Sequence, residues 1–265
     1  MPNVIVRLGM TATEMVTEFF NFLVFIGELT VTLFRVLKTP RYIPIRSILS
    51  IIESAGVYAL PIIGLLSFLI GMTLTYQMGL QLKNYGANIF IVDLLGLSIL
   101  REFAPLMTAI IVAGRSGSAF TAQLGTMKIR EEIDALRTMG VKPNEILVLP
   151  KLMALLIVLP LLTIWSMLFG LGGGMIVSKS MLHVGHIDFI NRFYEAVPVR
   201  YFYTGMIKTP VFGLLIATIG AFRGFQVTNS GDSVGVQTTK SVVQSIFFII
   251  VIDAVFSVLL SWLKL

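Results

Sequence analysis

The chain has 265 residues, of which 56% are hydrophobic and 13% charged, and its mean hydropathy is +0.90. Soluble domains carry about 25% charged residues, so this composition excludes a water-soluble protein and predicts an integral membrane protein. The absence of cysteine excludes disulfides, zinc–thiolate sites, iron–sulfur clusters and a thiol nucleophile. In a membrane protein the net charge of +6 indicates basic cytoplasmic loops rather than nucleic-acid binding.

The first 52 residues are predicted to form a segment that lies in the membrane interface. Residues 11–37 are apolar on much of their surface but include several charged residues, among them Glu28, and a basic stretch interrupted by prolines follows. This pattern is typical of a helix in the interface plane. The alternative is a sixth span at 19–34, but those 16 residues fall short of the roughly 20 that a spanning helix needs.

Five apolar runs are long enough to cross a bilayer as helices, and their lack of alternation excludes the strands of a membrane barrel. We therefore predict an all-α integral membrane protein with a single domain over residues 1–265. The predicted spans are residues 57–78, 89–114, 153–177, 203–222 and 242–263.

The distribution of Lys and Arg predicts the orientation in the membrane. With five spans, thirteen of these residues lie on the side of the N-terminus and six, including Lys208, on the other, while Arg101 lies within a span. Positive residues are retained in the cytoplasm. We therefore expect a cytoplasmic N-terminus and a C-terminus on the opposite side.

The longest hydrophilic segment, 114–144, follows the second predicted span on the cytoplasmic side. It predicts an amphipathic helix at about 126–139, ended by Gly140 and Pro143. A helix of this kind at the membrane surface suits the docking of a soluble partner.

Two ionisable residues, Arg101 and Glu102, fall near the middle of the second predicted span. Each costs on the order of 3 kcal/mol in a membrane helix, so such residues usually face a cavity or a partner charge. We consider two interpretations: an ion pair at a gate or substrate path, or a fixed bridge to Asp253 or Asp93. Pro105 follows directly and predicts a kink or a break in the helix.

Enzymatic interpretations are weaker. Ser116 lies in a GRSG sequence that resembles the nucleophile motif of intramembrane serine proteases, but the only histidines, His183 and His186, are predicted to lie across the membrane. These two histidines do not complete a metal site. The chain has no GxxxxGK[ST] phosphate loop, so any ATP it uses must be bound by another subunit.

A long motif identifies a family resemblance. The strings LREFAP (100–105), AGRSGSA (113–119), TAQLGTM (121–127) and EIDAL (132–136) resemble the signature of the MlaE-type permeases, the membrane subunits of phospholipid ABC transporters. One departure is Gln123, where many members carry Glu, so a role that requires a carboxylate there is in doubt.

The resemblance implies a homodimer of five-span subunits in the bacterial inner membrane. Each subunit would have an interfacial N-terminal helix and a cytoplasmic coupling helix, here residues 126–139, that docks into a P-loop ATPase subunit. Its contact residues would be Glu131, Glu132, Asp134 and Arg137. The alternative is that these charges form a solvated helix face.

By the same resemblance, phospholipid would occupy a cavity at the dimer interface, beneath a hexameric MCE-domain protein, and a small STAS-domain subunit would complete the complex. The cavity lining would draw on Leu74, Gln77, Leu82, Tyr85, Arg101, Glu102 and Phe103.

The complex would move phospholipid between the inner and outer membranes and so maintain outer-membrane asymmetry. ATP and Mg²⁺ would bind the ATPase, and this chain would hold no cofactor. The alternative function is an ion-coupled secondary transporter of an amphiphilic substrate that uses Arg101, Glu102 and Asp253.

Overall fold

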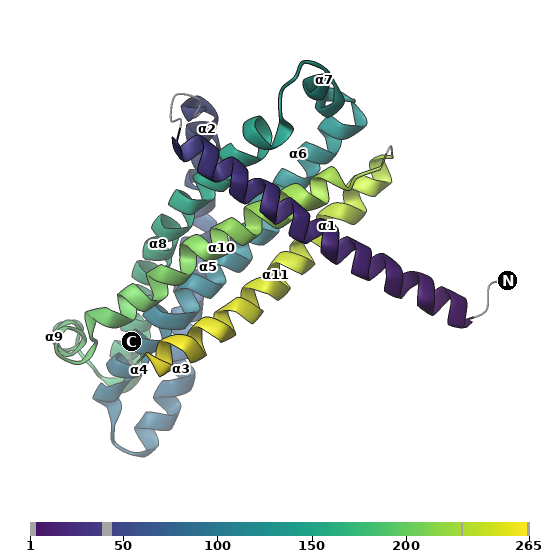
Figure 1. Ribbon diagram of the computed structural model, residues 1–265. Coiled ribbons are helices and arrows are strands. Elements are labelled where there is room, and N and C mark those ends of the chain that lie inside the picture. The colour runs from purple at the N-terminus through teal and green to yellow at the C-terminus, as the bar shows by residue number, and fades with distance from the viewer. Residues whose placement is uncertain (1–3, 39–43, 229, 264–265) are drawn as a thin grey trace.

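The computed structural model describes residues 4–38, 44–228 and 230–263, and these fold into helices without any strand (Figure 1). Residues 1–3 and 39–43 of the predicted interfacial segment lie outside the described residues. The α-helices are α1 (Val4–Lys38), α2 (Ile45–Ala55), α3 (Leu60–Asn84), α4 (Ile91–Ser98), α5 (Ala104–Val112), α6 (Ser118–Ile129), α7 (Glu132–Thr138), α8 (Leu149–Leu182), α9 (His186–Ala196), α10 (Val199–Phe225) and α11 (Gly231–Trp262). Short 3₁₀ turns (η2, Val57–Ala59; η3, Asn88–Phe90) and π turns (η4, Ile99–Phe103; η5, Ala113–Gly117; η6, Asn144–Val148) join some of them.

The all-α membrane fold is confirmed. By length and composition, five helical segments of the described chain are suited to cross a membrane: Val16–Arg35, Ile45–Asn84, Asn144–Leu182, Val199–Phe225 and Gly231–Trp262. The last four contain the predicted spans at 57–78, 153–177 and 203–222, and all of 242–263 except residue 263. Figure 1 shows α3, α8, α10 and α11 running side by side, with α7 and α9 at opposite ends of the bundle.

The predicted second span, 89–114, is not one uniform α-helix. Two π turns, η4 and η5, divide the helical run from Ile91 to Ile129 into the shorter helices α4, α5 and α6. At Pro105, where a kink or a break is predicted, the regular α-helix is interrupted by a π turn directly before the proline, in which the Ala104 amide donates to the Ile99 carbonyl five residues earlier. The wider turn accommodates a proline that cannot donate an amide proton.

Helix α1 crosses the end of the bundle instead of running along it (Figure 1). Between Glu18 and Arg35, about 25 Å of helix, its contacts stay at one level of the bundle. Phe22 packs on Phe222 of α10 and Phe25 packs on Phe225 of the same helix. Arg35 pairs with Glu145, at the start of the Asn144–Leu182 segment. A helix parallel to α10 would contact residues progressively farther along it. The contacts place α1 across the bundle, while its length and composition also suit a span, so the interfacial orientation stays a prediction.

Helices α3 and α8 pack with their backbones in close contact. A Cβ atom on Gly71 would lie 1.9 Å from the Gly170 carbonyl oxygen, and one on Gly173 would lie 2.2 Å from the Phe68 carbonyl oxygen. Ser67 and Ser166 share a buried hydrogen bond of 2.7 Å across the same contact. Small residues and interhelical hydrogen bonds of this kind are the usual means of helix association in membranes.

Two adjacent glycines of α8 provide a matched test of this packing. We expect Gly173→Ala to destabilise the protein by about 1–3 kcal/mol, because the added methyl group meets the α3 backbone. Gly172→Ala should be neutral or slightly stabilising, because a Cβ atom there meets nothing within 4 Å. Thermal unfolding of both variants in detergent measures the difference, and equal midpoints would contradict the proposed close packing.

Candidate functional site

A lysine without solvent exposure lies at the centre of an ionic cluster between three helical elements. The Nζ atom of Lys208, in α10, lies 2.5 Å from Glu102 Oε2 in η4 and 2.9 Å from Asp253 Oδ1 in α11, and the Lys208 side chain is 0% exposed. Because a charge buried in a membrane protein is costly unless it is paired, these two carboxylates account for the presence of the lysine.

Two further side chains complete the cluster. Ser257 Oγ, one turn beyond Asp253 on α11, accepts from Lys208 Nζ at 3.3 Å and donates to Glu102 Oε1 at 2.8 Å. Lys208 thereby uses all three of its N–H donors. The Arg101 Nε atom lies 3.2 Å from Glu102 Oε1. The cluster thus holds two cations and two carboxylates and is electrically balanced.

The local backbone explains how these groups meet. Gly205 lies one turn before Lys208, and a Cβ atom on it would be 2.0 Å from the Leu100 carbonyl oxygen. Its lack of a side chain lets α10 approach the η4 turn that carries Glu102. Pro210 follows Lys208 and leaves the Met206 carbonyl without its usual amide donor, and the Thr209 hydroxyl donates to that carbonyl at 2.9 Å.

The two aspartates considered as partners for Arg101 and Glu102 lie in different places. The structure places Asp253 in the cluster, joined to Glu102 through Lys208. Asp93 instead forms a bidentate pair with Arg192 of α9, with distances of 2.6 and 2.8 Å. This contact raises the pKa of the Arg192 guanidinium. Asp93 therefore fastens α9 to α4 and is not a partner of Arg101 in the described structure.

Sequence reasoning assigned Lys208 to a loop on the outer side, and that assignment is wrong, since the residue lies inside α10 and is fully buried. The signal in the sequence is that Lys208 falls within the apolar run predicted as the span 203–222. Removing it from the outer side lowers the positive residues there to five and leaves the predicted orientation unchanged.

The residues expected to line a lipid path are spread over α3 and η4. Leu74 and Leu82 are half-buried and pack against the core around Leu95, whereas Gln77 and Tyr85 are exposed on α3. Arg101 and Glu102 belong to the ionic cluster described above.

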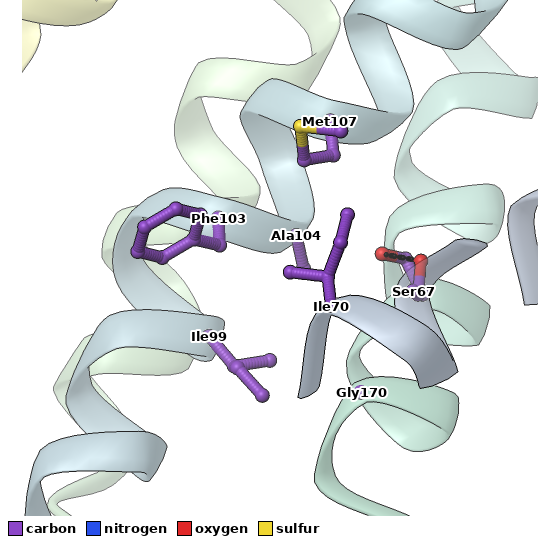
Figure 2. Close-up of a pocket in the computed structure, with 8 residues that line it drawn as sticks. Ser67, Ile70, Ile99, Phe103, Ala104, Met107 and Gly170 are labelled. Atoms are coloured by element: carbon purple, nitrogen blue, oxygen red, sulfur yellow. Dashed lines mark hydrogen bonds between the residues drawn. The ribbon is translucent and has the colours of Figure 1, made fainter. Parts of the chain in front are cut away.

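Phe103 is the only one of these seven that lines the pocket in Figure 2, which lies between α3, η4, α5 and α8 and has a cavity volume of about 10 Å³. The Ser67 hydroxyl and the side chains of Ile70 and Met107 face the same space. This volume is below the 300–1,000 Å³ of typical small-molecule sites, so the pocket does not hold a phospholipid.

The predicted coupling helix, 126–139, is two helices instead of one. Helix α6 ends at Ile129, Glu131 has a left-handed backbone with φ of 58°, and α7 begins at Glu132. Helix α7 ends at Thr138, and Gly140, which was predicted to stop the helix, follows with a φ of 75°. The continuous-helix prediction failed because the string MKIREEIDALRTM contains no glycine or proline that would mark the turn.

The four residues predicted to contact an ATPase remain together on this short helix and the turn before it. Glu131, Glu132 and Asp134 are exposed, and Arg137 pairs with Asp134 at 3.1 Å, while the apolar Ile133 between them is buried. The structure thus presents a charged surface held to the bundle by one apolar side chain.

The serine and the histidines considered for enzymatic functions lie in separate parts of the structure. Ser116 is 4% exposed in η5, and its hydroxyl has no hydrogen-bond partner in the described part of the chain. His183 and His186 lie beyond the far end of α8, and Gln123 is exposed on α6. No group of three or more potential metal ligands occurs among the described residues.

Comparison with known proteins identifies a family match that covers the features described above. The family model described as Permease MlaE matches residues 48–259, a range that includes the ionic cluster and α7. The chain belongs to the MlaE permease family.

Relatives of this MlaE-family chain occur in bacteria and plastids. A probable ABC transporter permease of Synechocystis is 37% identical over 194 residues, 73% of this chain and 72% of the relative. The chloroplast protein TRIGALACTOSYLDIACYLGLYCEROL 1 of Arabidopsis thaliana is 34% identical over 212 residues, 80% of this chain and 61% of the relative. The intermembrane phospholipid transport system permease MlaE of Haemophilus influenzae is 31% identical over 206 residues, 77% of this chain and 79% of the relative.

The ionic cluster of this MlaE-family chain makes a direct prediction for stability. Lys208→Met leaves Glu102 and Asp253 without their shared cation, so we expect a destabilisation of about 3–5 kcal/mol. Combining it with Asp253→Asn should restore most of the loss, because Glu102 then keeps Arg101 as its counter-charge. Thermal unfolding in detergent measures both effects.

The control for this experiment is Lys240→Met, which removes an exposed lysine of α11 and should change stability by less than about 0.5 kcal/mol. A Lys208→Met variant as stable as the control would show that the cluster does not hold the bundle together.

Proposed function

We propose that this chain is the membrane subunit of an ATP-driven transporter that moves phospholipids between the inner and outer membranes and so maintains outer-membrane lipid asymmetry. The observation that carries the proposal is the family match over residues 48–259. The Haemophilus influenzae relative is named as an intermembrane phospholipid transport permease, which supports the choice of substrate.

A second copy of the chain would complete the lipid path. The pocket between α3, η4, α5 and α8 is too small for a phospholipid. Helix α11 exposes a continuous apolar face that includes Phe247, Val255, Val258 and Trp262. Asp253 and Ser257 of the same helix reach the ionic cluster. In a homodimer joined through α11 and α3, the cluster would lie near the floor of a shared cavity, and Leu74, Gln77, Leu82, Tyr85 and Phe103 would contribute to its wall.

A separate ATPase would supply the energy. The chain contains no phosphate-binding loop, so ATP and Mg²⁺ would bind a P-loop subunit that docks on α7 through Glu131, Glu132, Asp134 and Arg137. Closure of the two ATPases would push on α7 and alter the packing of the bundle, squeezing lipid out of or into the cavity. This chain's part is conformational, and it requires two arrangements of the bundle that ATP and lipid each bias.

The remaining partners follow from the same proposal. A hexameric MCE-domain protein would receive or deliver lipid on the outer side of the inner membrane, and a small STAS-domain subunit would join on the cytoplasmic side. The excess of Lys and Arg at the end of the bundle that carries α7 supports a cytoplasmic location for that end, with the N-terminus inside and the C-terminus in the periplasm.

One observation favours a second candidate, an ion-coupled secondary transporter. The cluster of Lys208, Glu102 and Asp253 is of the kind that carries protons in such transporters. Under that function no ATPase would purify with the chain, and an ion gradient alone would drive substrate movement.

Charge reversal on α7 tests the proposed function. We expect Asp134→Lys to reduce both ATPase recovery with the tagged chain and ATP-dependent lipid transfer at least tenfold, because like charges at an interface cost several kcal/mol. The exposed Asp134–Arg137 pair contributes little to stability, so the variant should fold and insert normally.

The matched control is Asp232→Lys, the same reversal at an exposed position in the first turn of α11, which should transfer lipid within twofold of wild type. Wild-type transfer by the Asp134→Lys variant would argue against the coupling role.

A further inference from the structure

A cleft lies at the α7 end of the bundle, between α1 and the segment that joins α7 to α8. About 1,200 Å³ of it is free of protein atoms. Its wall comes from α1, α7, the 142–144 loop and the end of α10. The residues that line it are Phe25, Gly27, Glu28, Val31, Thr32, Arg35, Arg137, Lys142, Pro143, Asn144 and Phe225.

Cations from three different segments face this cleft. Arg35 and Lys142 both pair with the Glu145 carboxylate, at 3.1 and 3.8 Å. Arg137 pairs with the exposed Asp134. These cations are all more than half exposed, and ion pairs of that kind are weak and exchange readily with another anion.

A further cation, Lys128, lies next to the lining residue Phe225. Lys128 Nζ donates to the Phe225 carbonyl at 2.5 Å, and burial together with the nearby Arg137 lowers the pKa of this lysine. Lys128 is thus a half-buried cation whose hydrogen-bond acceptor is a neutral carbonyl. A bound anion near it would relieve this unfavourable environment.

The carboxylates of the region do not cancel these charges. Glu28 lines the cleft but accepts a hydrogen bond from Asn144 Nδ2 at 3.2 Å, while Asp134 and Glu145 pair with the cations named above. Of the charged side chains that line the cleft, three are cations, Arg35, Arg137 and Lys142, and one is a carboxylate, Glu28, so the lining carries an excess of positive charge.

The other wall of the cleft is apolar and continues into the lipid-facing surface of α1. Phe25 and Phe225 pack edge to face at 5.9 Å, and Val31 is 58% exposed. The same helix exposes further large apolar side chains: Phe19, Phe20, Leu23, Val24 and Phe34. An exposed apolar face of this size on a helix that crosses the bundle end belongs in the membrane interface.

We propose that this cleft binds the phosphate group of an anionic phospholipid from the cytoplasmic leaflet, with the acyl chains against α1. Basic pockets between helices at the cytoplasmic membrane surface are suited to such headgroups. The inference rests on the proposed cytoplasmic location of the α7 end. The site is distinct from the transport path, because it lies at the end of the bundle under α1 and shares none of the cluster residues.

The test is lipid binding by the purified full chain in mild detergent, without any ATPase. Dioctanoyl phosphatidylglycerol, dioctanoyl phosphatidylcholine and inorganic phosphate are titrated separately, with the thermal unfolding midpoint as the readout. We expect phosphatidylglycerol to bind at least tenfold more tightly than phosphatidylcholine. Inorganic phosphate should bind weakly, because it lacks the acyl chains.

Removal of two cations then locates the site. Each cation near a membrane surface contributes about fivefold to binding, so Arg35→Gln with Lys142→Gln should weaken phosphatidylglycerol binding about 25-fold. The charge-preserving pair Arg35→Lys with Lys142→Arg should retain it. The control pair Arg46→Gln with Lys240→Gln removes two exposed cations outside the cleft and should bind as wild type.

Equal binding of the two lipids by wild type would overturn the proposal, as would undiminished phosphatidylglycerol preference in the Arg35→Gln, Lys142→Gln variant. Either result would favour another occupant of the cleft, such as an acidic segment of a soluble partner. Because no ATPase takes part, these outcomes are independent of whether the chain is a transport subunit.

Discussion

The ammonium group of Lys208 imposes the strongest constraint on this fold. It has no contact with solvent, so its charge must be met inside the bundle, and the two carboxylates that meet it come from η4 and α11. Three helical elements that are distant in the sequence are thereby fixed around a single group. Any rearrangement of the bundle during transport must either preserve these contacts or exchange them together, since a lone carboxylate or ammonium left in this environment would be costly.

Close backbone packing and π turns allow Lys208 to reach the two carboxylates. Gly205 lets α10 approach the backbone of the η4 turn, and the π turn before Pro105 keeps the helical run continuous where a proline would otherwise interrupt it. On the other side of the bundle, Gly71 and Gly173 bring α8 against α3 in the same way. Polar groups in lipid must find partners within the protein, so backbone proximity and buried hydrogen bonds such as Ser67–Ser166 act together.

Helix α1 joins the elements at the α7 end of the bundle to each other. Near one end Glu18 pairs with Arg223 of α10, whose guanidinium also donates to Gln244 of α11 at 2.8 Å. Near the other end Arg35 pairs with Glu145, just after the segment that carries α7. The helix thus connects the surface proposed for ATPase docking with the helix that carries Asp253.

The fold class was readable from the sequence because apolar run length and charge placement depend on local composition alone. Arg101 and Glu102 were recognisable as unusual for the same reason. Their partner Lys208 could not be recognised from the sequence, because a lysine near the end of a span can extend its side chain to the interface, and only tertiary contacts show that this one is buried. The turn at Glu131 could not be predicted, because a non-glycine residue with positive φ has no sequence marker there. Pairings such as Asp93 with Arg192 depend on tertiary contacts across 99 positions, which no local pattern encodes.

ATP-driven phospholipid transport can be measured in proteoliposomes that contain this chain with its copurified partners and labelled phospholipid. We expect lipid transfer that requires ATP and Mg²⁺, stops when the ATPase is omitted, and continues when ion gradients are collapsed. Transfer driven by an ion gradient in vesicles that contain only this chain would contradict this expectation, and would assign the buried cluster around Lys208 to ion coupling instead.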